Sequence, residues 1–404
     1  MAGPLEGIRV LDLSRILAGP WASQMLADLG AEVIKVERPG CGDDTRGWGP
    51  PYMPDAEGES NGEAAYFHGA NRGKLSVCID MARPEGQGLI RELAAQSDVL
   101  IENFKVGGLE KYSLDYDSLR QVNARLVYCS ITGFGQTGPY AARAGYDFMI
   151  QAMGGMMSVT GEADGQPMKI GVALADVLTG LYAANAIQAA LIHQRATGQG
   201  QYIDMALLDV QVATLANQAM NYLASGVNPK RLGNAHPNIV PYQAFETADG
   251  YIILAVGNDA QFERFCELAG RSELAADERF RCNSDRVRHR QALVPEVVSI
   301  MQQRSSSDWL EALNARGIPC GPINNLDQVF ADPQVRHRGL ELELEHPTAG
   351  SVASVANPIR LSQTPIEYER APPLLGQHTD EVLAGVLELD AETIASLRSG
   401  DIIS

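Results

Sequence analysis

The sequence has few cysteines and histidines, and neither type is spaced as a metal site or a disulfide framework requires. Its six cysteines are scattered along the chain, and no two of them form a CxxC pair. Its seven histidines are dispersed in the same way. We therefore expect reduced, mostly packed thiols and no metal in the functional site.

Positive charge is also scarce. The chain carries 32 lysines and arginines against 50 aspartates and glutamates, which gives a formal net charge of -18. Nucleic-acid recognition relies on a basic surface, so this balance argues against a nucleic-acid partner. An anionic cofactor would need a local basic pocket.

Long apolar runs are missing as well. A membrane span needs about 20 consecutive apolar residues. The most apolar stretch, Ile170–Ile192, is interrupted by Asp, Asn, Gln and Thr. The first residues, Met1–Gly7, show no basic segment followed by an apolar one, as a signal peptide would. We expect a soluble protein that stays in the cytoplasm and has no membrane partner.

What the chain does contain is a regular alternation of apolar strands and helices. Strands are predicted at 8–14, 31–38, 75–80, 98–104 and 126–132, and helices at 19–30, 84–96, 116–123, 208–224 and 379–387. Such alternation is typical of an α/β fold with a largely parallel, Rossmann-like sheet. The turn after the first strand, Ser14–Pro20, has one glycine where a G-x-G-x-x-G dinucleotide cradle needs several. A nicotinamide dehydrogenase is therefore disfavoured.

The length of 404 residues is sufficient for two domains. Residues 1–225 are expected to form most of a large Rossmann-like domain and residues 226–340 a smaller α+β domain with linkers. Residues 341–404 are expected to return to the large domain. A Gly-, Pro- and acid-rich stretch between Arg38 and Arg72 is expected to be a lid, a binding loop or disordered. Its Trp48 would either cover a ligand or pin the loop.

One carboxylate stands alone in the most apolar part of the chain. Asp176 is the only residue between Ile170 and Ile192 that is charged at neutral pH, and a helix is predicted over this stretch. Burial of an unpaired carboxylate costs several kcal/mol, so Asp176 is either a cap of the helix N-terminus or a reagent. Small neighbours such as Gly171 and Gly180 leave room for a bulky partner, which favours a nucleophile.

Short motifs along nearly the whole chain together resemble the family III CoA-transferases. They are Ala18-Gly19-Pro20, Ile34–Pro39, Asn71–Ser76, Glu102-Asn103-Phe104, Gly145-Tyr146-Asp147, Ala175-Asp176 with Gly180, Thr197–Gln201, Gly321–Asn324 and Leu375–Thr379. Each motif is weak alone, and their order along the chain makes the resemblance specific. It implies an enzyme that transfers coenzyme A (CoA) between carboxylic acids.

The resemblance implies roles for particular residues. Asp176 would attack an acyl-CoA thioester, form a mixed anhydride and then an aspartyl thioester, and deliver CoA to an acceptor acid. A further family lysine falls on Ala144, and Arg143 beside it would replace that lysine. The other CoA-binding positions of the family fall on Leu17, Ala18, Arg38, Ile79, Asn103 and Lys111. No cofactor is expected to stay bound, because CoA and acyl-CoA are substrates.

The acyl group is expected to be a dicarboxylate. The loop Arg231–Tyr242 resembles that of family members that handle larger, dicarboxylic acyl groups. Its His236 would bind the distal carboxylate or cap the turn before Pro237. Succinyl-CoA is the expected donor, and glutarate or a similar acid is the expected acceptor. Low-ranked substrate-binding candidates are Trp48, Tyr146, Asp147 and His236.

Two alternatives stay open. An α-methylacyl-CoA racemase needs an acid/base pair, and its histidine would stand in a Gly-His-Asp context where this chain has Gly145-Tyr146-Asp147. An inactive CoA-binding protein would bind CoA without turning over any thioester. The resemblance further implies a homodimer whose subunits interlock like chain links, and a small domain with linkers on both sides suits that threading.

Overall fold

The computed structural model describes residues 3–55, 58 and 60–404, and it divides the chain into two compact units. Unit 1 comprises residues 1–156, 170–219 and 334–404, and unit 2 comprises residues 157–169 and 220–333. The expected boundaries lie after residues 225 and 340, whereas the units divide after residues 219 and 333. Residues 157–169 pack with unit 2, although they come from the middle of the expected large domain.

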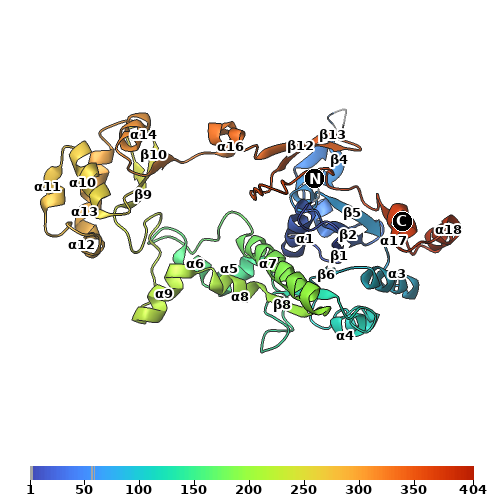
Figure 1. Cartoon of the computed structure of the whole chain (residues 1–404). Helices are drawn as coiled ribbons and strands as arrows, with labels where there is room; N and C mark the ends of the chain where they lie inside the picture. The colour runs from blue at the N-terminus through green and yellow to red at the C-terminus, as the bar shows by residue number, and fades with distance from the viewer. Residues whose placement is uncertain (1–2, 56–57, 59) are drawn as a thin grey trace. The chain divides into compact units, whose positions relative to one another are not determined.

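Unit 1 is built on a six-stranded, fully parallel sheet with the order β5-β2-β1-β6-β7-β8 (Figure 1). Its strands are β1 (Arg9–Asp12), β2 (Glu32–Glu37), β5 (Lys74–Cys78), β6 (Val99–Glu102), β7 (Val127–Thr132) and β8 (Tyr202–Ala206). The predicted α/β, Rossmann-like fold is confirmed. The strand order reverses between β1 and β6, and ligands of open α/β sheets bind at the carboxyl ends of the strands beside such a point.

Helices cover both faces of this sheet, because successive residues of a strand point to opposite sides. Val10 of β1 belongs to a core with α1 (Ala18–Asp28) and α7 (Leu174–Thr197). The next residue, Leu11, belongs to a second core with α3 (Pro84–Ala95) on the other face. The sheet is therefore buried on both sides, as its apolar strands predict.

The other elements of unit 1 connect or extend this sheet. They are η2 (Glu110–Tyr112), α4 (Tyr116–Leu119), α5 (Asp147–Met153), α8 (Leu207–Ala213), the hairpin β12 (Glu341–His346) and β13 (Gly350–Val355), α17 (Thr379–Val386) and α18 (Ala391–Ser399). The prediction ended with a helix at 379–387 and missed α18. Few apolar residues mark α18 in the sequence, and Ile394 is the residue that it buries in the second core.

Two further helix predictions need correction. The helix predicted over 170–192 begins at Leu174 and continues to Thr197. The helix predicted over 208–224 is two helices, α8 and α9 (Ala216–Ser225). The break coincides with Ala216, whose φ of 46° lies in the left-handed region that a continuous right-handed helix cannot use.

The stretch between Arg38 and Arg72 is not a single loop. Its described residues include η1 (Asp44–Gly47), the antiparallel pair β3 (Tyr52–Pro54) and β4 (Ser60–Ala64), and α2 (Ala65–His68). Buried ion pairs fix its first part, because Lys35 pairs with Asp43 at 2.9 Å and Arg46 pairs with Glu37 at 2.7 Å. These described residues are ordered, so of the three expectations disorder is wrong for this part of the chain, and a lid or a binding loop stays a prediction.

By length and composition alone, α7 could span a membrane. In unit 1, however, one face of α7 is buried in the first core. Gly180 brings α7 close to α1, since a Cβ at this position would lie 2.8 Å from the carbonyl oxygen of Ala18. Gly180 thus serves helix packing and does not, as the sequence suggested, make room beside Asp176.

Unit 2 is a small α+β unit with an antiparallel sheet of order β11-β10-β9. Its elements are β9 (Tyr242–Glu246), β10 (Tyr251–Ala255), α10 (Asp259–Leu268), α11 (Ser272–Ala276), α12 (Asn283–Arg288), α13 (Arg290–Met301), α14 (Ser306–Ala315), β11 (Cys320–Pro322) and α15 (Leu326–Ala331). Phe245, Ile252 and Trp309 lie in a core of its own. The short helices α6 (Met156–Val159) and α16 (Pro333–His337) lie at the unit boundaries.

Candidate functional site

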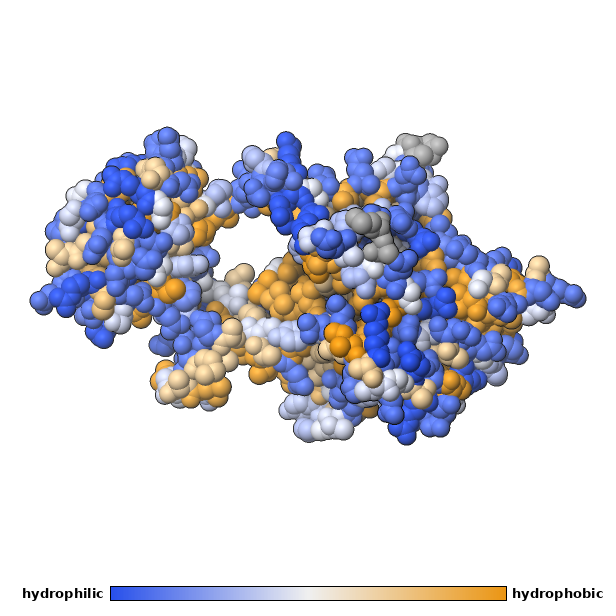
Figure 2. Space-filling model, viewed as in Figure 1, coloured by the Kyte–Doolittle hydropathy of each residue, from blue (hydrophilic) through white to orange (hydrophobic). Residues whose placement is uncertain are grey.

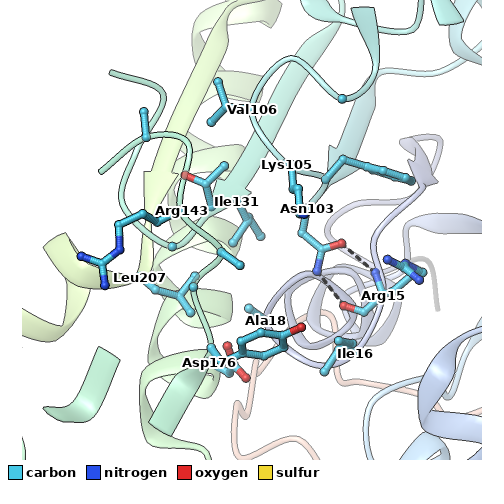
Figure 3. A pocket seen from close by; sticks show the side chains of 18 of the residues that line it. Arg15, Ile16, Ala18, Asn103, Lys105, Val106, Ile131, Arg143, Asp176 and Leu207 are labelled. Carbon is cyan, nitrogen blue, oxygen red and sulfur yellow. Dashed lines mark hydrogen bonds between the residues drawn. The ribbon is translucent and has the colours of Figure 1, made fainter. Parts of the chain in front are cut away.

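Loops at the carboxyl ends of the strands of unit 1 surround a cavity of about 440 Å³ (Figure 3). Arg15–Ala18 follow β1, Asn103–Val106 follow β6, and Thr132 ends β7. Asp176 enters from the first turn of α7. The cavity therefore lies at the switch point of the strand order, where this type of sheet binds ligands.

Asn103 fixes the loop that follows β1. Its side-chain oxygen accepts a hydrogen bond from the N–H of Arg15 at 2.9 Å, and its amide donates to the carbonyl of Arg15 at 2.7 Å (Figure 3). Ile16 in this loop has a φ of 72°, and its N–H donates to the carboxylate of Asp43 at 3.2 Å. A branched residue at positive φ is strained, so these bonds hold the loop in shape beside the cavity.

Four cationic side chains line the cavity, although the chain as a whole is strongly acidic. They are Arg15, Lys105, Lys111 and Arg143. Among the described lining residues, Asp176 is the only carboxylate. A concave site lined by one sign of charge concentrates ligands of the opposite sign. The cavity is thus the local basic pocket that an anionic ligand requires.

The expected CoA-binding residues fall into two groups. Leu17, Ala18, Asn103, Lys111 and Arg143 line the first cavity together with Asp176. Arg38 and Ile79 line a neighbouring cavity of about 360 Å³.

The two cavities share the side chains of Arg15, Phe104 and Tyr112. All the expected CoA positions therefore lie along two adjoining cavities, and none of them is isolated elsewhere in unit 1.

The N-terminus of α7 is capped by Asp147 and not by Asp176. Oδ1 of Asp147, the first residue of α5, accepts hydrogen bonds from the N–H groups of Ala175 at 2.8 Å and of Asp176 at 3.4 Å. Within the part of the chain that the structure describes, no group donates a hydrogen bond to the carboxylate of Asp176. Asp176 therefore lies in the first turn of α7 without capping it, and its role as a reagent stays a prediction beside that of a first-turn acid.

The carboxylate of Asp176 is hard to ionise. Burial raises its pKa to about 7, and the nearby carboxylate of Asp147 adds to the rise. Burial and the same two carboxylates raise the pKa of the Tyr66 hydroxyl, so Tyr66 of α2 lies within their electrostatic range. An unpaired carboxylate beside an open cavity, ionised above about pH 7, has the properties of a nucleophile.

Of the two aromatic residues expected to contact the substrate, Tyr146 lines the cavity and Trp48 does not. Tyr146 precedes α5 and lines the cavity, with 64% of its surface exposed. Trp48 does not line the cavity, and its ring meets that of Tyr66 edge-on with 5.3 Å between the centroids. Trp48 is therefore connected to the site through Tyr66.

His236 belongs to unit 2. Its Nδ1 accepts a hydrogen bond from the N–H of Asn238 at 3.0 Å, and its ring packs on Tyr242 with 5.2 Å between the centroids. Burial and the charge of Arg290 lower its pKa, so the ring is neutral at pH 7. His236 thus caps the turn at Pro237, which is one of the two roles that the sequence left open, and no described residue hydrogen-bonds to its Nε2.

Sequence reasoning missed three residues of this region. Arg15 and Lys105 each directly follow a predicted strand, and basic residues at the ends of neighbouring parallel strands were a signal that could have identified them. Tyr66 carried no such signal, because it lies in the stretch that was expected to be a loop.

Comparisons with known proteins point to one family. The model of CoA-transferase family III matches residues 5–379. Over 381 residues the chain is 57% identical to a succinate–glutarate CoA-transferase of Agrobacterium fabrum, covering 94% of this chain and 95% of the relative. Over 400 residues it is 45% identical to human succinyl-CoA:glutarate CoA-transferase, covering 99% and 90%. A crystal structure of a CaiB/BaiF family protein from Brucella suis is 54% identical, with a TM-score of 0.84, and covers 96% of this chain and 100% of that chain.

Proposed function

We propose that this chain, which belongs to CoA-transferase family III, transfers CoA from succinyl-CoA to glutarate. The activities of the similar proteins from Agrobacterium fabrum and human support these two substrates. The observation that carries the proposal is the unpaired carboxylate of Asp176 in a cavity lined by four cations. The four cations can bind the negatively charged phosphates of CoA, and the carboxylate of Asp176 can attack the electrophilic thioester carbon.

In the proposed first half-reaction, a carboxylate oxygen of Asp176 attacks the thioester carbon of succinyl-CoA. The C–S bond breaks, CoA leaves as a thiolate, and the succinyl group stays on Asp176 as a mixed anhydride. The thiolate then attacks the side-chain carbonyl carbon of Asp176. Succinate leaves with one oxygen that came from Asp176, and an aspartyl-CoA thioester remains.

In the second half-reaction, a carboxylate of glutarate attacks the aspartyl thioester and displaces the CoA thiolate again. The thiolate attacks the glutaryl carbon of the new anhydride, so glutaryl-CoA forms and Asp176 is regenerated. Both acids react as carboxylates, and the cycle neither consumes nor releases a proton. The amide groups at the start of α7 favour negative charge near Asp176 throughout.

Mass spectrometry tests the reaction. Purified protein is mixed with succinyl-CoA and a panel of free mono- and dicarboxylic acids in deuterated water. We expect glutaryl-CoA to appear in step with the loss of succinyl-CoA, and the Asp176→Ala variant to form none. CoA release without a new thioester, or deuterium uptake at the α-carbon without transfer, would overturn the proposal in favour of a hydrolase or a racemase.

Labelled glutarate tests the anhydride steps separately. The steps above leave one glutarate oxygen on Asp176 and pass it to succinate in the next turnover. Glutarate with ¹⁸O in its carboxylates should therefore yield ¹⁸O-succinate during multiple turnovers. Unlabelled succinate beside labelled glutaryl-CoA would show that no aspartyl anhydride forms, even if transfer itself is established.

We assign His236 a hydrogen bond from Nε2 to the distal carboxylate of the acyl group, because this nitrogen is left free when Nδ1 caps the turn. A neutral imidazole donates a hydrogen bond worth about 1 kcal/mol. His236→Ala should lower kcat/KM about fivefold more for glutarate than for a monocarboxylic acid of the same length. The control is His289→Ala, also in unit 2, and an equal loss for both acids would remove this role.

The proposal includes a homodimer. Leu181, Tyr182 and Ile192 of α7 are exposed, and Figure 2 shows apolar side chains gathered over this helix. Contiguous exposed apolar surface on a protein usually marks an interaction site. Light scattering at micromolar concentration should give twice the mass of the chain, and a monomer would contradict the dimer without affecting the assigned chemistry.

A further inference from the structure

A cluster of one partly buried and two buried side chains lies in unit 1 outside the two cavities of the proposed active site. Glu63 belongs to β4, His68 ends α2, and His346 ends β12. Each residue offers one atom with a lone pair, and these atoms all lie within 4.8 Å of one another. This group could not be recognised from the sequence, because His346 is far from the other two residues along the chain.

Both histidines are almost fully buried and incompletely paired. His68 is 5% exposed and His346 is 4% exposed. Within the described residues, Nδ1 of His68 and Nε2 of His346 have no hydrogen-bond partner. An unpaired polar atom in the interior is costly, so a partner that these rings could share would stabilise the fold.

The carboxylate of Glu63 is already oriented towards the rings. Its Oε1 receives a hydrogen bond from Arg46 at 2.6 Å, and its Oε2 lies 3.3 Å from Nε2 of His68. The two imidazole rings are 5.4 Å apart between centroids.

We propose that Glu63, His68 and His346 bind a divalent transition-metal ion, and that Zn²⁺ suits this ligand set best. Two imidazole nitrogens and one carboxylate oxygen are common zinc ligands, and a water completes the tetrahedron. Ligand atoms around Zn²⁺ are separated by about 3.3 Å, so small side-chain rotations close the site.

The groups behind these ligands decide which ring nitrogen of His346 carries the proton. In the structure the N–H of Ala349 donates a hydrogen bond to Nδ1 of His346 at 3.2 Å, so metal binding at Nε2 requires that this hydrogen bond breaks. The proton then lies on Nδ1, which can donate to the hydroxyl of Thr348, 3.4 Å away. Arg46 holds the carboxylate of Glu63 from behind, as outer-shell partners of metal ligands do.

The ion fastens α2 to the hairpin β12–β13. With four residues, α2 is too short to be stable as an isolated helix. Because His68 is its last residue and His346 ends β12, a shared metal ion would tie α2 to β12 and stabilise this short helix. The site is structural, and it does not rest on the transferase activity.

Calorimetry with ZnCl₂ tests the site on the full chain after dialysis against a chelator. We expect one ion per chain, tetrahedral Co²⁺ absorption bands when Co²⁺ replaces Zn²⁺, and no competition from Mg²⁺, which prefers oxygen ligands. His68→Gln and His346→Gln should each weaken binding at least about 100-fold. The control variants His193→Gln and Cys41→Ser each remove an exposed group that could bind Zn²⁺ nonspecifically, and they should leave the affinity for Zn²⁺ unchanged.

Thermal melting gives an independent readout. Zn²⁺ at 100-fold above its Kd should raise the Tm of the wild-type chain by about 5 °C and leave the Tm of Glu63→Gln unchanged. Glu63→Gln keeps the shape of the side chain and an oxygen for Arg46, so it answers the question even if a histidine variant does not fold. Absence of stoichiometric binding, or equal affinity in all three variants, would overturn the proposal.

Discussion

Two aspartates of unit 1, the fully buried Asp12 and the half-buried Asp176, have pKa values that shift in opposite directions. Asp12, at the end of β1, accepts hydrogen bonds from Ser14 and Ser23 and pairs with Lys74 at 3.2 Å. Burial alone would raise its pKa, but Lys74 and Lys35 hold the pKa of Asp12 below its usual value.

Asp176 lacks all of these partners. Among the described residues no cation pairs with it, the carboxylate of Asp147 acts on it as a like charge, and its pKa rises to about 7. The comparison teaches that burial does not decide what a carboxylate does. Partners turn Asp12 into part of the fold, and their absence leaves Asp176 available for chemistry.

The largest expected effect is on the rate of CoA transfer, which should depend on Asp176 and not on Asp12. Asp176→Asn should reduce CoA transfer at least about 10³-fold, because an amide cannot attack a thioester. Its melting temperature should not fall, since Asp176 makes no bond that the variant would lose. The assay is the formation of glutaryl-CoA, with Asp209→Asn on α8 as the control. Transfer within tenfold of the wild type would contradict the role of Asp176.

The mirror experiment concerns stability. Asp12→Asn should destabilise the chain by about 3–5 kcal/mol, because it leaves the buried ammonium group of Lys74 without the carboxylate that it pairs with. Urea unfolding measures the change, and the folded fraction should transfer CoA within a few-fold of the wild type. A cost below about 1 kcal/mol would mean that the buried pair contributes little.

A smaller effect is expected from the cations around Asp176. Arg15→Gln and Lys111→Met should each raise KM for succinyl-CoA about tenfold and leave kcat within about twofold, because they remove charge that binds CoA and not the reacting group. Arg83→Gln, exposed and outside the cavities, is the control. A loss confined to kcat would place these residues in the chemical step instead.

The smallest effect sharpens the electrostatic part of the comparison. Asp176 attacks in its ionised form, so kcat/KM for succinyl-CoA should be full above its pKa of about 7 and fall about tenfold per pH unit below it. Asp147→Asn removes the neighbouring like charge, lowers the pKa of Asp176 and should move this profile by less than about one unit to lower pH. A shift to higher pH would mean that Asp147 stabilises the ionised form.

Much of the fold could be predicted because its signals are local. The apolar runs and glycine stops of the sheet domain lie within a few residues of the elements that they mark, and the strands were found on that basis. The break between α8 and α9 depends on the backbone of Ala216, and α18 depends on packing of Ile394, and neither leaves a strong periodic pattern. The sequence identified Gly180 as a small residue, but only the packing of α7 against α1 shows why a side chain does not fit there.

The sequence by itself determined which reagents are available: a solitary carboxylate at Asp176 and an ordered set of motifs that resembles one family. Only the tertiary structure decided which groups meet. It gave the capping of α7 to Asp147, gathered four cations into one cavity, and joined His346 to Glu63 and His68. The physical reason is range, since hydrogen bonds and ionic interactions act over a few ångströms in space, and distance along the chain says little about distance in the fold.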